Sequence, residues 1–222
     1  MIKNGIYTTL ITSIIIQVLT GIIEFITVFI NVPHKFLILK QMMILELCVQ
    51  FIEGSFYIYW LYNFKNISNI TPNRYFDWVI TTPTMLINLI FYLIFLKNKD
   101  NELNFIDLFI KEFNPIITVL LLNWLMLLFG YFSETSVIPV LLGISLGFIP
   151  FLIYYYIIYK NYAVLTSNGM KIYIYFLFFW TLYGIVAILP YKIKNMCYNI
   201  LDLFSKNFFG LFLTYLIFTN RY

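Results

Sequence analysis

Leu201-Asp202-Leu203-Phe204-Ser205-Lys206-Asn207 places an aspartate and a lysine inside the last long apolar run of the chain, which extends from Asn199 to Phe218. An ionised side chain near the centre of a bilayer costs several kcal/mol, roughly 2.5–3.5 on insertion scales. The i,i+4 spacing puts Asp202 and Lys206 on one face of a helix. This stretch alone permits two interpretations: a structural ion pair that holds a helix bundle together, or a functional site.

The composition places nearly the whole chain in a membrane. Of its 222 residues, 62% are hydrophobic and only 11% are charged, and the mean hydropathy is +0.86. A soluble domain of this length exposes far more charge. The net charge of +4 requires no nucleic-acid partner, and Cys48, Cys197 and His34 form no metal-binding pattern. With one histidine and no Ser-His-Asp set, we expect neither an enzyme nor a metal site.

The apolar segments predict an all-α membrane protein with a single seven-helix domain over residues 1–222. A spanning helix needs about 20 mainly apolar residues. Seven segments satisfy this requirement, at about residues 5–30, 37–62, 72–96, 105–132, 137–159, 171–189 and 196–218. The short loops predict antiparallel neighbours. The lysine distribution favours an extracellular N-terminus and a cytoplasmic C-terminus, since the loops after the first, third and fifth segments contain Lys35, Lys97, Lys99 and Lys160.

The third segment begins with polar residues, in the stretch Arg74-Tyr75-Phe76-Asp77-Trp78-Val79-Ile80-Thr81-Thr82-Pro83. Arg74 can be explained as an interfacial residue whose charged end reaches the membrane surface. Asp77 can be explained as a helix N-cap if the helix starts late. Alternatively, Asp77 is an intramembrane anion, for which Lys206 is the one deeply placed lysine available as a partner.

These residues resemble a known family. Arg74-Tyr75-x-Asp77-Trp78-x-x-Thr81-Thr82-Pro83 resembles the third helix of microbial (type 1) rhodopsins, and Asp202-x-x-x-Lys206 is similar to their seventh helix. Trp180-x-x-Tyr183 resembles the aromatic wall of their retinal pocket. The resemblance covers the whole seven-helix plan, although only these three segments are locally specific.

The resemblance implies that all-trans retinal is bound covalently to Lys206 as a Schiff base. A protonated Schiff base is a buried cation and needs a counter-ion. Asp77 and Asp202 would supply it, with Arg74 offsetting the surplus negative charge and Thr81 one turn from Asp77. Asp77 would also accept the proton after photoisomerisation. The residues implied to line the polyene are Trp78, Thr82, Met85, Trp180 and Tyr183.

Three positions depart from the pattern of outward proton pumps in this family. Asn88 occupies the position of the internal proton donor, and an amide cannot donate a proton in that role. Gly184 stands where pumps usually have a proline, and Ala187 stands where they usually have a second tryptophan. The change at Asn88 argues against a fast, self-sufficient proton pump.

The second segment contains Glu46-Leu47-Cys48-Val49-Gln50-Phe51-Ile52-Glu53, whose polar positions share one helix face. One interpretation is hydrogen bonding between helices. The other is a water-filled cation path lined by carboxylates, which Ser13 and Asn207 would complete. Glutamates on the second helix are also a feature of channelrhodopsins, and the whole combination is similar to viral rhodopsins of algal giant viruses, in particular the group of light-gated cation channels. Glu24 has no partner that the sequence identifies.

The resemblance therefore implies a light-gated cation channel in which the Schiff-base proton moves to Asp77. The alternatives are a light-driven outward proton pump without a carboxylic donor at Asn88 and, third, a sensory photoreceptor. The expected partners are retinal, membrane lipids and monovalent cations or protons, with no nucleic acid and with homo-oligomerisation left open. If the chain is viral, we expect it in a membrane of the infected host cell.

Overall fold

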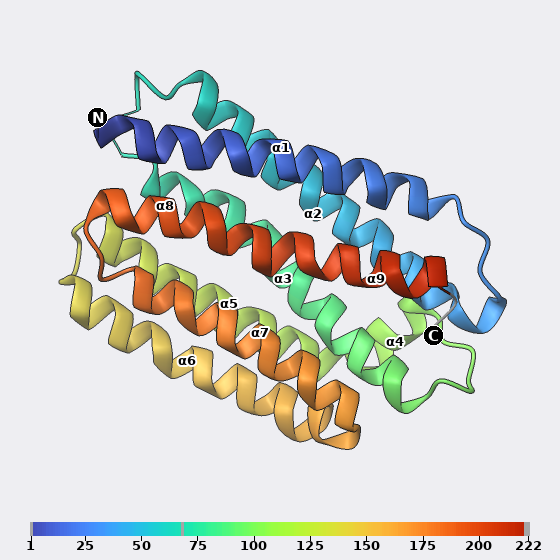
Figure 1. Cartoon of the computed structure of the whole chain (residues 1–222). Coiled ribbons are helices and arrows are strands. Elements are labelled where there is room, and N and C mark those ends of the chain that lie inside the picture. Colours follow the sequence, from blue (N-terminus) through green and yellow to red (C-terminus); the bar gives the residue numbers. More distant parts are fainter. Residues whose placement is uncertain (1, 68, 220–222) are drawn as a thin grey trace.

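Helical rods lie side by side in the computed structural model, which describes residues 2–67 and 69–219 (Figure 1). They are α1 (Ile2–Val28), α2 (Leu37–Tyr62), α3 (Thr71–Lys97), α4 (Phe105–Lys111) with α5 (Phe113–Glu134), α6 (Val140–Asn161), α7 (Ser167–Val186), and α8 (Tyr191–Asp202) continued by η3 (Leu203–Asn207) and α9 (Phe208–Thr219). Short turns, η1 (His34–Phe36) and η2 (Ala163–Leu165), precede α2 and α7. The predicted all-α bundle of seven helices is confirmed.

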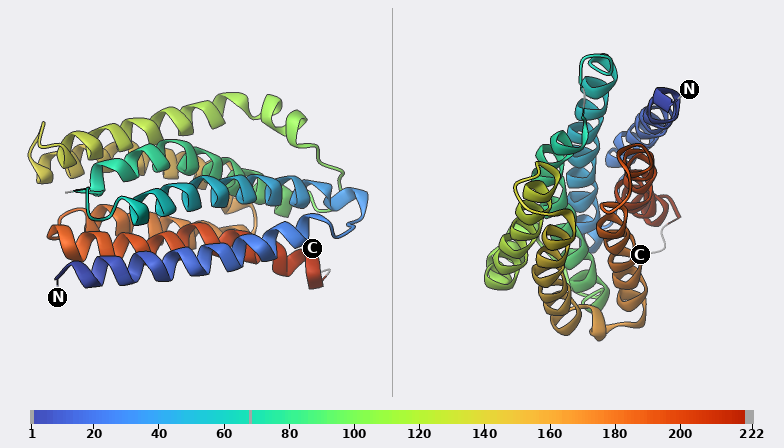
Figure 2. Two further views of the ribbon diagram at one scale, coloured as in Figure 1. Left: turned by 90° about the horizontal axis from the view of Figure 1, so that it is seen from above. Right: turned by 90° about the vertical axis from the view of Figure 1, so that its left-hand side faces the viewer.

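Each rod packs against the next one along the chain, and α1 also packs against α8 and α9, which closes the bundle (Figure 2). Helix α1 begins and helix α9 ends at opposite ends of the bundle, as an odd number of spans requires (Figure 1). Helix α3 has the largest share of buried residues among the rods, and it contacts α2, α5 and α7. Every residue from Asn88 to Leu96 of α3 is buried. The residues of α3 are therefore positioned to face several neighbouring helices at once.

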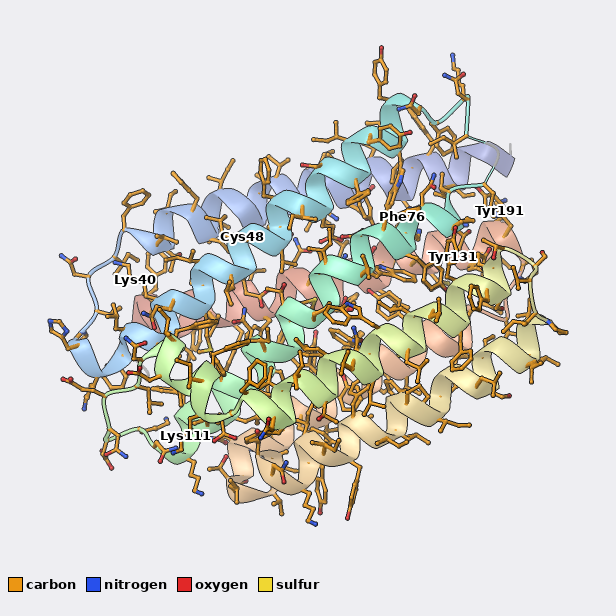
Figure 3. All side chains as sticks on the ribbon, turned by 180° about the vertical axis from the view of Figure 1, so that it is seen from behind. Lys40, Cys48, Phe76, Lys111, Tyr131 and Tyr191 are labelled. Carbon is orange, nitrogen blue, oxygen red and sulfur yellow. The ribbon has the colours of Figure 1, made fainter. Side chains whose placement is uncertain are left out.

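Six helices in the described part of the chain are long and apolar enough to cross a membrane. Helix α2 is not among them, because Glu46, Gln50 and Glu53 lower its hydropathy. All three of these side chains are buried in the bundle rather than exposed to lipid. By contrast, Cys48 on α2 and Phe76 on α3 are exposed (Figure 3). The chain is thus an integral membrane protein whose second helix is polar on its inner face.

Proline and capping residues set several helix ends. The predicted fourth helix is divided into α4 and α5 at Glu112. Pro115 lacks the N–H group that would bond to the carbonyl of Lys111, and its ring would clash there. Pro190 stands at the N-cap of α8, which begins at Tyr191, before the predicted start at about residue 196. The Thr166 hydroxyl accepts a hydrogen bond from the Gly169 N–H (3.0 Å) and starts α7 at Ser167, before the predicted start at about residue 171.

Candidate functional site

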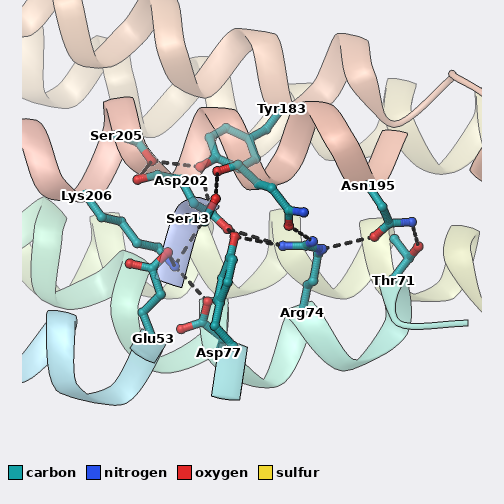
Figure 4. Close-up of polar contacts among 12 residues, drawn as sticks. Ser13, Glu53, Thr71, Arg74, Asp77, Tyr183, Asn195, Asp202, Ser205 and Lys206 are labelled. Atoms are coloured by element: carbon teal, nitrogen blue, oxygen red, sulfur yellow. Dashed lines mark hydrogen bonds and ion pairs between the residues drawn. The ribbon is translucent and has the colours of Figure 1, made fainter. Parts of the chain in front are cut away.

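Lys206 lies at the centre of a cluster of carboxyl groups. Its Nζ atom donates a hydrogen bond to Oδ2 of Asp77 at 2.7 Å, and it lies 3.5 Å from Oε1 of Glu53 and 3.8 Å from Oδ1 of Asp202 (Figure 4). The lysine is 2% exposed, and all three carboxylic residues are fully buried. The sequence predicted Asp77 and Asp202 beside the lysine, but it assigned Glu53 to an ion path.

The local geometry of the seventh rod explains how Lys206 is presented. Leu203–Asn207 form a π-helical turn between α8 and α9. Such a turn inserts an extra residue into the helix and is frequent at functional sites. Lys206 lies inside this turn and donates a hydrogen bond to Asp77 of α3, whereas Asp202 directly precedes the turn.

Asp202 is held by a separate polar network. Its Oδ2 atom lies 3.2 Å from Nη1 of Arg74 and also accepts a hydrogen bond from the Tyr57 hydroxyl. Its Oδ1 atom accepts a hydrogen bond from the Tyr183 hydroxyl at 2.6 Å. The Tyr183 hydroxyl also lies 2.7 Å from the hydroxyl of Ser205 (Figure 4). Asp202 therefore links the charged groups of α3 and η3 to α2 and α7.

The Arg74 side chain is fully buried, so the interpretation of Arg74 as an interfacial residue is wrong. Its guanidinium donates to the side-chain oxygens of Asn195 (3.1 Å) and Asn199, and it lies 4.8 Å from the centroid of the Trp60 ring. Sequence reasoning missed these partners, together with Tyr57, because each is an isolated polar or aromatic residue among many. For Asn195 and Asn199, the sequence did contain one indication: they are four residues apart and so lie on the same face of α8.

The Asp77 position also excludes the N-cap interpretation. Helix α3 begins at Thr71, so Asp77 lies well inside it. The Thr81 hydroxyl donates to the main-chain carbonyl of Asp77 at 3.0 Å and does not bind its carboxylate. Among the described residues, Oδ1 of Asp77 has no hydrogen-bond partner. Asp77 thus faces Lys206 through one oxygen, while its second oxygen remains available.

An apolar pocket extends from Lys206 between α3, α5, α6 and α7. All five residues predicted to line a polyene lie in its wall: Trp78, Thr82, Met85, Trp180 and Tyr183. Sequence reasoning missed the opposite wall, formed by Met126, Phe148, Phe151 and glycines of α6. An apolar slot with an amine in its wall fits an extended apolar aldehyde, which a lysine can bind covalently.

Small residues keep one part of this pocket open. Gly184 and Ala187, at two of the positions that depart from the pattern of pumps, both line it. A Cβ atom added at Gly184 would lie 2.6 Å from the Phe148 ring. On the α3 side of the pocket, the Asn123 amide donates a hydrogen bond to the Thr82 hydroxyl at 2.8 Å and fixes the position of this hydroxyl. The residues present therefore fit retinal as the bound group.

A second set of buried polar residues runs along α1. Its members are spaced alternately four and three residues apart, and each is at most 6% exposed: Ser13, Gln17, Thr20, Glu24 and Thr27. This spacing places them on one face of the helix. Ser13 donates to the main-chain carbonyl of Asn199 at 2.9 Å. Of these residues, sequence reasoning singled out only Ser13 and Glu24, although the polar periodicity of the whole row was visible.

Thr20 connects this row to α2 and η3. Its hydroxyl accepts hydrogen bonds from the side-chain amides of Gln50 (2.8 Å) and Asn207 (2.5 Å). On α2, Oε1 of Glu46 accepts a hydrogen bond from the Asn88 amide at 2.7 Å. The structure thus brings Gln50 and Asn207 together, whereas Glu46 binds α3 and Glu53 faces Lys206. The interpretation as hydrogen bonding between helices holds for Glu46 and Gln50.

Many of these polar groups have no hydrogen-bond partner among the described residues. They include both polar atoms of the Gln17 amide, both carboxyl oxygens of Glu24 and Glu53, and the side-chain carbonyl oxygens of Gln50, Asn88 and Asn207. Buried polar groups are normally hydrogen-bonded to protein or to ordered water.

Within residues 2–67 and 69–219, no group of three or more His, Cys, Asp or Glu side chains is arranged to hold a metal.

Comparison with known proteins identifies the class. The family model of bacteriorhodopsin-like proteins matches residues 6–220, and the chain belongs to this family. Members of the family are photoreceptors, ion pumps or channels that bind retinal through a lysine Schiff base. No curated protein matches the chain.

Several solved structures share the fold. The viral rhodopsin OLPVRII is 26% identical with a TM-score of 0.84, and the match covers 98% of this chain and 99% of that chain. The blue light-absorbing proteorhodopsin from Med12 is 19% identical with a TM-score of 0.77, covering 97% and 98%. The proton-pumping rhodopsin AR2 from the marine alga Acetabularia acetabulum is 16% identical with a TM-score of 0.73, covering 98% and 96%.

Proposed function

We propose that this chain is a retinal photoreceptor that carries all-trans retinal on Lys206 and acts as a light-gated cation channel. The position of Lys206 in the wall of the apolar pocket supports the attachment. Bound there as a Schiff base, retinal would supply light absorption and an isomerisation that redirects the nitrogen. The residues of the chain would then hold, accept and return the proton of that nitrogen.

Asp77 is the proposed proton acceptor, because its carboxylate already lies 2.7 Å from the Lys206 nitrogen. Asp202 completes the counter-ion, and the buried guanidinium of Arg74 compensates its charge at 3.2 Å. If all groups were ionised, the three carboxylates of Asp77, Asp202 and Glu53 would exceed the two cations by one negative charge. We assign the extra proton to Glu53, which is the carboxyl without a hydrogen bond in the described structure.

The row of buried, unpartnered polar groups between α1, α2 and η3 is the observation that supports a channel. Water is the natural partner for such groups, and a hydrated row lined by carboxyl and amide oxygens favours cations. The proposed path uses Ser13, Glu46, Gln50, Glu53 and Asn207, extended by Gln17 and Thr20. The chain's membrane would be that of an infected host cell if it is viral, as the likeness to OLPVRII suggests.

An outward proton pump is the second candidate. Asn88 has no acidic group, but it donates a hydrogen bond to Glu46, so a carboxyl lies beside the usual donor position. A pump would use Asp77 as the acceptor in the same way. A sensory photoreceptor stands third, since no feature of the described residues supports a signalling partner.

Vesicles that contain the purified, retinal-loaded protein and a potassium gradient separate the two main candidates. A channel releases potassium down its gradient under light and stops when the gradient is spent. Light-driven proton movement that builds a gradient, without any potassium flux, would instead support the pump. The Lys206→Ala variant is the control for light dependence in both cases.

A further inference from the structure

Glu24 on α1 is a buried carboxyl that the proposed channel does not yet use. Its side chain is 0% exposed, and neither of its carboxyl oxygens has a hydrogen-bond partner among the described residues. A buried charge without a partner is strongly unfavourable, and such a group keeps its proton instead. Glu24 is therefore expected to be a carboxylic acid in the resting protein.

The seventh rod provides a specific place for this carboxyl. A Cβ atom added at Gly210 of α9 would lie 1.9 and 2.5 Å from Oε1 and Cδ of Glu24 and 3.1 Å from Oε2, so all of its closest contacts belong to the Glu24 carboxyl group. Gly210 thus leaves a notch into which the end of the Glu24 side chain fits. Because the colliding atoms are the far end of a flexible side chain, an alanine at this position would displace the carboxyl without disturbing the backbone.

Glu24 lies between the end of the bundle and the Lys206 site. It stands one helical turn before the end of α1 at Val28 and one turn beyond Thr20. Thr20 accepts the hydrogen bond of Asn207, which is the neighbour of Lys206 in sequence. On the outer side, the next turn contains Thr27, whose hydroxyl donates to that of Thr214 at 3.4 Å. A proton on Glu24 thus lies one turn from the end of α1 on one side and one turn from Thr20 on the other.

Few other charged groups face this position. On α2, Glu46 is the carboxyl that interacts electrostatically with Glu24. Glu53 faces Lys206 instead, and Lys40 donates a hydrogen bond to the Ile30 carbonyl at 3.0 Å. Residues 208–219 of α9 contain no charged side chain, and Lys206 of η3 points to Asp77. The lysines of α8, at positions 192 and 194, belong to the opposite end of the rod. Glu46 is consequently the competing candidate for any proton donated from this side.

We propose that Glu24 is the internal proton donor that returns a proton to the Lys206 nitrogen after light has moved the first proton to Asp77. The Glu24 O–H bond breaks, the proton passes along hydrogen-bonded groups and water near Thr20 and Asn207, and an N–H bond forms at Lys206. The Glu24 carboxylate then takes a proton from the solvent at the end of α1. This inference rests on the proposed light-driven deprotonation at Lys206, which channel and pump share.

Flash spectroscopy of the retinal-loaded protein tests the donor. We compare the wild type with Glu24→Gln, Gly210→Ala and Glu46→Gln, and with Glu102→Gln as a matched control at an exposed glutamate. In Glu24→Gln the return of the proton to the nitrogen should slow on the order of 100-fold. It should also slow about tenfold for each unit of rising pH, because the proton now comes from bulk water. Azide, a small weak acid, should restore the rate.

Gly210→Ala should reproduce the slow return while keeping the glutamate, and Glu102→Gln should behave as the wild type. Infrared spectra of the retinal-free protein give a second readout, in which a carboxylic-acid C=O band is lost in Glu24→Gln and shifted in Gly210→Ala. An unchanged return rate in Glu24→Gln, or a slow return in Glu46→Gln alone, would overturn the donor assignment. If the wild type never loses the proton from its nitrogen, the underlying proposal for Lys206 and Asp77 fails instead.

Discussion

Lys206 binds Asp77 on a different helix more closely than it approaches Asp202 on its own. The Nζ atom of Lys206 lies 2.7 Å from the Asp77 carboxylate and 3.8 Å from that of Asp202. Asp202 directly precedes the π-helical turn Leu203–Asn207 that contains Lys206, and Nη1 of Arg74 lies 3.2 Å from the Asp202 carboxylate. The two aspartates therefore play different parts: one faces the lysine directly, and the other belongs to a wider network.

Replacing Asp77 tests this difference. In the retinal-loaded protein, Asp77→Asn removes the closest negative charge from the Lys206 nitrogen, so positive charge spreads along the bound chromophore. We expect the visible absorption band to move to longer wavelength and light-induced loss of the proton from the nitrogen to disappear. Absorption and flash spectroscopy measure both effects.

Glu53→Gln is the matched comparison. Glu53 lies 3.5 Å from the lysine and has no hydrogen-bond partner among the described residues, so we assign it a proton at rest. Replacing a neutral carboxylic acid by an amide changes no charge, and the band should move less than in Asp77→Asn. A larger shift in Glu53→Gln would contradict the assignment of the two carboxyls.

Lys206→Ala should abolish chromophore binding. The pocket would remain, but it would have no amine for covalent attachment. Adding all-trans retinal to the variant should give no visible protein band, whereas Lys171→Ala, at an exposed lysine, should give the wild-type band. A wild-type band in Lys206→Ala would place the attachment elsewhere.

Arg74→Gln should destabilise the fold. It would leave the carboxylate of Asp202 buried without its cation, and breaking such a buried pair costs roughly 3–5 kcal/mol. Thermal or denaturant unfolding in detergent should reveal the loss. The double variant Arg74→Gln/Asp202→Asn should recover part of it, because it removes the uncompensated charge; no recovery would argue against a direct coupling of this pair.

Glu46→Gln should reduce cation current without altering colour. Glu46 binds Asn88 at 2.7 Å and is not among the carboxyls around Lys206. We expect the absorption maximum to stay unchanged and the photocurrent to become severalfold smaller. This decrease corresponds to a conduction barrier that is higher by about 1 kcal/mol. Cys48→Ser, at an exposed position of the same helix, is the control. An equal loss of current in both variants would show a non-specific effect on α2.

Much of the fold could be predicted from hydropathy, because each spanning helix must be long and apolar. The division at Glu112 and the π-helical turn were not predicted. The first falls at Lys111-Glu112-Phe113-Asn114-Pro115, where polar residues and a proline were included in one long predicted segment, and the second depends on how η3 packs against α1, α2 and α7. Polar residues mark both places, but a polar residue alone does not distinguish a break or a π-helical turn from a continuous helix.

The site was partly predictable for a similar reason. Lys206, Asp77 and Asp202 stand out because ionised groups are rare in apolar helices. Tyr57, Asn195 and Asn199 do not stand out, since aromatic and amide residues are common in this chain. Their importance follows only from the position of Arg74, whose burial the sequence left open. Thr20 is similar: its role depends on the meeting of α1, α2 and η3.

Voltage-clamp recording under illumination tests the central proposal, a light-gated cation channel, most directly. We expect a photocurrent that changes direction with voltage, and whose reversal potential moves with the cation gradient by up to ~59 mV for a tenfold change in a monovalent cation. Lys206→Ala should give no photocurrent. A light-induced current that stays outward at every voltage, whatever the cation gradient, would contradict the channel and identify a pump.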